Sequence, residues 1–120
     1  MASQNYRDLL VWQKGITLVE EIYAVTRQFP DSETFGLANQ LQRAAVSVPS
    51  NIAEGQARGQ PKDFRRFLRI SLGSLAEIDT QLEVARRLDY ISSDDAAKLN
   101  ELVLELRKML FGLINSLPNQ

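Results

Sequence analysis

The chain has 120 residues, 14 of them basic and 15 acidic, for a net charge of −1, and it contains neither histidine nor cysteine. This length suits a single domain with one hydrophobic core. The missing residue types remove the commonest general base, the thiol nucleophile and the usual zinc ligands, so we expect no catalytic residue, no metal site, no cofactor and no small-molecule substrate.

The start of the chain, MASQNYRDLL, lacks the basic segment and apolar run of an export signal. Apolar stretches elsewhere are a few residues long, whereas a membrane-spanning helix needs about 20. The lack of cysteine is compatible with a reducing compartment. We therefore expect a cytoplasmic protein with no membrane partner.

The first two predicted helices cover residues 7–29 and 33–57. The first ends before Pro30, and the second follows a cap at Asp31 or Ser32 and should bend at Pro49, which has no amide hydrogen to donate. The apolar stripe of the first helix runs through Leu9, Trp12, Ile16, Val19 and Tyr23 and is widened by Val11, Leu18, Ile22, Val25 and Phe29. The stripe of the second consists of Ala38, Leu41, Ala45, Val48 and Ile52. Trp12 and Tyr23 could stack nucleic-acid bases, but their core spacing favours packing.

The last two predicted helices cover residues 61–88 and 93–117. Pro61 occupies a favoured first position, and Ser92 or Ser93 can cap the last helix. Short connections make successive helices antiparallel, so we predict an all-α, up-down-up-down four-helix bundle forming one domain over residues 1–120.

A polar stripe follows the second predicted helix on the side away from its apolar face. Serine and asparagine compete with the helical backbone for hydrogen bonds, so a merely solvated face would more readily use Glu, Lys or Gln. One interpretation is a buried or interfacial network with the third helix, with Arg43 paired to Glu77 and Gly73 allowing close approach. The alternative is a solvated face. The network residues are Arg43, Ser47, Asn51, Glu54, Ser74 and Glu77.

A basic cluster begins the third predicted helix. The segment RGQPKDFRRFLR carries a net charge of +4, which leaves −5 on the rest of the chain. The cluster is either a solvated helix face or a tentative nucleic-acid-binding patch, whose weak phosphate contacts would add up in an oligomer. The candidate residues are Arg58, Lys62, Arg65, Arg66 and Arg69.

Three segments together resemble one bacterial family: DLLVWQKGITLVEEIYAVTRQFP, ETFGLANQLQRAAVSVPSNIAEG and FLRISLGSLAEIDTQLEVARRLDYI. The chain resembles the four-helix bundle proteins encoded within intervening sequences of 23S rRNA genes, which are related to the accessory variability determinant proteins of diversity-generating retroelements. The resemblance implies a ring-like homopentamer, no enzymatic activity and a suspected nucleic-acid partner. The retroelement proteins are strongly basic, whereas this chain is slightly acidic.

Two classes of function remain open from the sequence. The first is an oligomeric bundle that binds RNA or a nucleoprotein partner through repeated basic patches. The second is a protein-interaction or structural scaffold with no nucleic-acid role. Apolar residues on several sides of the first and last helices favour self-association in both cases.

Overall fold

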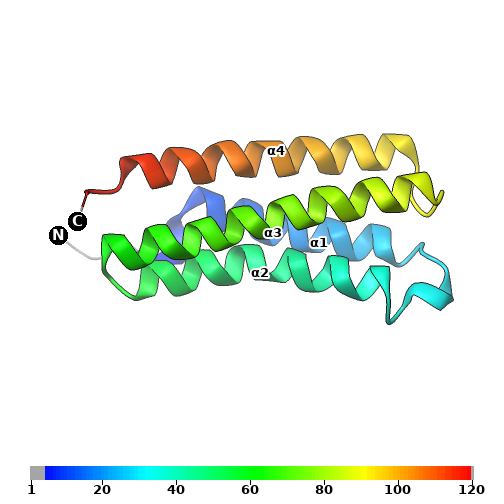
Figure 1. The fold of residues 1–120 in the computed structure, drawn as a ribbon, viewed down its shortest axis with the longest axis horizontal. Helices are drawn as coiled ribbons and strands as arrows, with labels where there is room; N and C mark the ends of the chain where they lie inside the picture. The colour runs from blue at the N-terminus through cyan, green and yellow to red at the C-terminus, as the bar shows by residue number, and fades with distance from the viewer. Residues whose placement is uncertain (1–4, 120) are drawn as a thin grey trace.

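A computed structural model describes residues 5–119 as four long helices that run alternately up and down (Figure 1). Two 3-10 turns, η1 (Tyr6–Asp8) and η2 (Asp31–Glu33), precede the first and second helices. The helices are α1 (Leu10–Thr26), α2 (Leu37–Ala57), α3 (Pro61–Arg87) and α4 (Ser93–Ser116). The rod measures 49 × 22 × 20 Å, and the described residues contain no β-strand. The predicted all-α four-helix bundle is confirmed.

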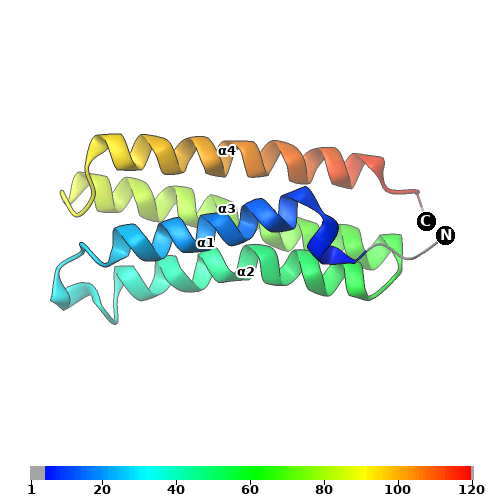
Figure 2. The same cartoon turned by 180° about the vertical axis from the view of Figure 1, so that it is seen from behind.

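Each helix packs against two neighbours, and α4 returns to α1 to close the bundle (Figure 2). The turn between α2 and α3 lies at the same end as η1 and the end of α4. No described helix is both long enough and apolar enough to cross a membrane. The largest fully buried side chains are Leu18, Ile22, Leu41, Val48, Ile52, Leu68, Leu75, Ile78, Leu82, Leu99, Leu106 and Leu110.

The core face of α1 lies on the side of the predicted stripe that includes Val11, Leu18 and Ile22, and not on the side of Ile16 and Tyr23. Ile16 and Tyr23 are 37% and 38% exposed, whereas the buried stripe consists of Val11, Gly15, Leu18, Ile22 and Thr26. Apolar residues surround much of this helix, so periodicity alone could not choose between two overlapping stripes. The packing of α1 on α2 made the choice, because the bundle needs a small residue at the contact between Gly15 and Pro49. A Cβ atom on Gly15 would lie 3.3 Å from Pro49 Cβ.

Two predicted helix starts were several residues too early. The segment before α1 is the 3-10 turn η1, followed by an extended Leu9 (φ −76°, ψ 125°). Before α2, Asp31 begins η2 instead of capping a helix, and Gly36 (φ −109°, ψ −116°) breaks the chain direction. The ends of α3 and α4 agree with the prediction within one residue, and the Ser92 hydroxyl accepts from the Asp95 amide at 3.1 Å.

Glu33 organises the end of the bundle where the α1–α2 and α3–α4 connections meet. One carboxylate oxygen accepts from the Leu37 amide at 3.0 Å and caps α2, and the other accepts from the Tyr90 hydroxyl at 3.0 Å. The hydrogen bond to Glu33 raises the pKa of Tyr90 above its ordinary value of 10.0. One side chain therefore starts a helix and ties two connections together.

Helix α2 continues from Leu37 to Ala57 with Pro49 inside it, and the bend at Pro49 stays a prediction. Proline leaves the carbonyl of Ala45 without its usual helical donor. Two nearby carbonyls of α2 accept hydrogen bonds from serine hydroxyls. The Ser47 hydroxyl donates to the Ala44 carbonyl at 2.6 Å, and the Ser71 hydroxyl of α3 donates to the Val48 carbonyl at 2.9 Å.

Candidate nucleic-acid interface

The predicted basic residues gather where α2 turns into α3. Arg58 follows α2 as its C-cap residue, and Gly59 makes the turn with a φ of 77°, a value that favours glycine. Pro61 then starts α3, whose first two turns carry Lys62, Arg66 and Arg69 on one exposed side. We call Arg58, Lys62, Arg66 and Arg69 the basic patch.

Two arginines of the basic patch share one aromatic ring. The guanidinium carbons of Arg58 and Arg66 lie 4.9 and 4.5 Å from the centroid of Phe67, which is only 9% exposed. Arg58 also forms an ion pair with Glu54 at 3.2 Å. Helical periodicity does not predict this role of Phe67, although its position beside Arg66 and the basic turn is a usable signal.

Arg65 belongs to a different environment from the basic patch. Its guanidinium donates to the carbonyl of Pro118 at 2.6 Å, and the residue is half-buried. The structure therefore brings four of the five predicted cations together and turns the fifth toward the end of the chain after α4. Lys62 and Arg69, in contrast, have no ion-pair partner among residues 5–119.

The predicted polar network exists in a smaller form than expected. The Ser47 and Ser74 hydroxyls share a hydrogen bond of 2.6 Å across the α2–α3 contact, and the Asn51 amide donates to the Ser47 carbonyl at 2.7 Å. Ser71 is fully buried and bonds α2 as well. Small hydroxyl groups thus join two closely packed helices without leaving their own oxygens unpaired.

The charged members of that network are placed differently from the prediction. Arg43 and Glu77 line one shallow hollow, but both are exposed and no ion pair joins them in the described chain. Glu54 pairs with Arg58 instead. An exposed pair of long side chains gains little free energy in water, so nothing holds Arg43 against Glu77 within a single chain.

Gly73 does not provide the close approach that we expected of it. A Cβ atom there would meet nothing within 4 Å, because the residue faces outward. The close contact lies at Gly55, where a Cβ atom would sit 2.7 Å from Phe67 Cβ and 3.1 Å from Phe64 Cδ1. The tight packing of α2 on α3 is therefore nearest the turn, directly beneath the basic patch.

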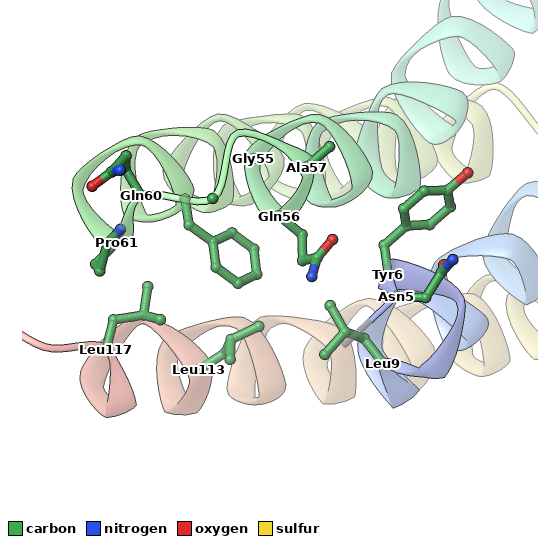
Figure 3. Close-up of a pocket in the computed structure, with 12 residues that line it drawn as sticks. Asn5, Tyr6, Leu9, Gly55, Gln56, Ala57, Gln60, Pro61, Leu113 and Leu117 are labelled. Carbon is green, nitrogen blue, oxygen red and sulfur yellow. The ribbon is translucent and has the colours of Figure 1, made fainter. Parts of the chain in front are cut away.

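A cavity of about 700 Å³ lies at the same end of the bundle (Figure 3). Leu9, Leu113 and Leu117 project into it from the side of η1 and α4, opposite Gln56 and Pro61. Its lining is mostly apolar and carries no ionised side chain.

The protein comparisons agree with this architecture. The model of a family described as 23S rRNA-intervening sequence protein matches residues 7–112. This chain belongs to that family.

A member of the S23 ribosomal protein family shows the same bundle. The crystal structure of this Bacteroides thetaiotaomicron VPI-5482 protein of unknown function superposes with a TM-score of 0.82 at 24% sequence identity. The match covers 89% of the present chain and 100% of the other. No curated protein matches the chain. These comparisons therefore establish the family and the fold, and the function has to be inferred from the site.

Proposed function

We propose that this member of the 23S rRNA-intervening sequence protein family is a non-enzymatic, self-associating bundle that binds RNA, alone or in a nucleoprotein, through the basic patch. The observation that carries the proposal is the exposed cluster of Arg58, Lys62, Arg66 and Arg69 on a chain that is otherwise acidic. Arginine and lysine side chains bind phosphate oxygens irrespective of base sequence.

The position of the patch adds to this argument. Lys62 and Arg66 lie in the first two turns of α3, where the helix dipole is positive and disfavours cations. A bound phosphate would relieve this repulsion. The family description also refers to an intervening sequence of 23S rRNA, which is in keeping with an RNA partner.

Self-association is proposed because large apolar side chains remain exposed on separate faces. Leu104 and Phe111 are 52% and 41% exposed beside a groove between α3 and α4, and Val46 is 41% exposed on the α1–α2 side. Such surfaces commonly become interfaces. A pentamer is the stoichiometry that the resemblance to the bundle family and its retroelement relatives implies.

A second candidate function is a protein-interaction or structural scaffold without a nucleic-acid role. The observation that favours it is the same groove between α3 and α4, which has apolar walls including Leu72, Leu104 and Phe111. The net charge of −1 also gives the whole molecule no long-range attraction for RNA. RNA binding by the intact protein therefore separates the two functions.

The test compares the unmodified protein with a patch variant, Lys62→Gln/Arg66→Gln/Arg69→Gln, by fluorescence anisotropy with a structured RNA at about 50 mM salt. We expect the unmodified protein to bind with steep salt dependence. The patch variant should lose most of the affinity, with a log–log salt slope lower by about 0.7–0.9 for each lost contact.

The matched control is Arg87→Gln/Lys98→Gln/Lys108→Gln, which removes the same charge from exposed positions outside both the basic patch and the groove between α3 and α4. Equal losses in both variants would assign binding to overall charge and not to the patch. No binding by the unmodified protein would favour the scaffold function.

A further inference from the structure

The Phe67 ring is the common support of two cations that come from different helices. Arg58 caps the end of α2 and Arg66 lies in the second turn of α3, and both guanidinium carbons are within 5 Å of the ring centroid. The ring itself is held in place, because Gly55 allows the backbone of α2 to press against its Cβ atom. The packing of the Phe67 ring therefore fixes where the two guanidinium groups lie.

This arrangement suits phosphate recognition. A guanidinium that stacks on a ring keeps its N–H edges free for phosphate oxygens, and it has already lost much of its conformational freedom before binding. The ion pair between Arg58 and Glu54 is exposed, so a phosphate can replace the carboxylate at small cost. The two cations lie close enough to contact neighbouring phosphates of one strand.

The same geometry removes the feature that single-stranded RNA needs. Proteins that bind single strands stack the bases on exposed aromatic side chains. Here Phe67 is covered, and Phe64 is half-buried in the wall of the end cavity. The aromatic side chains that are exposed in the described chain, Tyr23, Phe35 and Phe111, belong to α1, the α1–α2 connection and α4.

The shape of the surface points the same way. The patch lies on the outside of a 27-residue helix and not in a groove that could enclose a strand. Double-helical RNA presents its phosphates outward, and its binding proteins read the backbone and shape. Building on the RNA-binding function proposed above, we propose that Arg58, Phe67 and Arg66 form a phosphate clamp for double-helical RNA, in which Phe67 is a positioning residue.

The first experiment compares two probes with the unmodified full-length protein, a mixed-sequence RNA duplex of about 20 base pairs and an oligouridine strand of equal length, at low salt. We expect the duplex to bind about tenfold more tightly or better, since the strand gains no stacking to offset its ordering. Equal or tighter binding of oligouridine would overturn the inference. If neither probe binds, the proposed RNA-binding function fails together with it.

The second experiment keeps the charge and removes the stacking. Arg66→Lys replaces a guanidinium on the ring, and Arg69→Lys makes the same change at an exposed arginine that stacks on no ring in the described chain. We expect Arg66→Lys to weaken duplex binding about threefold or more beyond the effect of Arg69→Lys, because only the first loses a planar guanidinium held against a ring. Equal effects of the two changes would refute the clamp.

A third pair of variants tests Phe67 directly. Phe67→Leu keeps an apolar side chain under the patch, and Phe35→Leu makes the same change at a 93% exposed ring that lies outside the groove between α3 and α4. We expect only Phe67→Leu to lower duplex affinity, about fivefold, with the helical signal retained in both. Should Phe67→Leu fail to fold, the Arg66→Lys and Arg69→Lys pair decides the matter.

Discussion

Glu83 shows how strongly a single residue of α3 is controlled by its neighbours. Its carboxylate accepts from Arg86 at 2.8 Å and from Arg87 at 2.8 Å, and both partners lie within one helical turn of it. The hydrogen bond from Arg86, then that from Arg87, lowers the pKa of Glu83 from 4.5 to about 2. These two arginines are therefore already paired, unlike Lys62 and Arg69, which makes them a poorer phosphate site.

This pairing predicts a defined pH dependence. Since the pKa of Glu83 is lower in the folded state, its stabilising effect is fully present above pH 4.5 and is lost as the pH falls toward 2. Carbon-detected NMR titration should show Glu83 ionised below pH 4, and Glu83→Gln should flatten the dependence of the unfolding midpoint on pH in this window. Titration of Glu83 near 4.5 would disprove the pairing.

At the scale of the element, the contact of α2 with α3 depends on where glycine allows the backbones to meet. Gly55 faces Phe67 and Phe64, whereas Gly73 faces open space in the middle of α3. The two positions therefore respond in opposite ways to the same added methyl group. Helix propensity favours alanine at both, and only packing distinguishes them.

We expect Gly55→Ala to lower the free energy of unfolding by about 1–3 kcal/mol, because the new atom would overlap Phe67 Cβ, 2.7 Å away. Gly73→Ala should raise it by about 0.5–1 kcal/mol, since an exposed helical glycine is replaced without a clash. Urea denaturation of both variants measures the difference. A loss of stability in Gly73→Ala would mean that another subunit covers this position.

At the scale of the whole molecule, the bundle leaves apolar surface that one core does not use. The groove between α3 and α4 has a volume of about 520 Å³. Its lining includes the charged residues Asp79 and Arg107 and the exposed Leu104. We expect light scattering to give a mass above the 13.6 kDa of one chain. A monomer at tens of micromolar protein would contradict the self-association that we propose.

A single charge should then shift the assembly. Leu104→Glu places a carboxylate in the groove, so we expect it to lower the measured mass while the helical signal stays unchanged. Lys98→Glu creates the same residue at an exposed position outside the groove lining and should leave the mass unaltered. Identical masses for Leu104→Glu and the unmodified protein would exclude this groove as the interface.

Much of the fold follows from local chemistry in the sequence. Pro30, Gly59, Pro61 and Ser92 mark the connections because their backbone preferences act within a few residues, and these connections appear where the sequence predicts them. The apolar face of α2 was also predictable, since it is the one stripe without a competing apolar face beside it. Local signals of this kind depend on no distant partner.

Tertiary structure decided everything that required a choice between similar local options. The buried face of α1 depends on the fit of Gly15 against Pro49, and the start of α2 depends on Glu33, which also binds Tyr90 57 positions later. Arg65 does not belong to the basic patch, because its guanidinium donates a hydrogen bond to the carbonyl of Pro118, 53 positions away. By itself the sequence determined the four helices, most of their ends and the presence of a basic turn. Contacts between distant residues decided that Arg58 and Arg66 share the Phe67 ring, whereas Arg65 bonds the carbonyl of Pro118. Helical periodicity could not predict this, because it gives the spacing of side chains along a helix and not the surface that each side chain contacts.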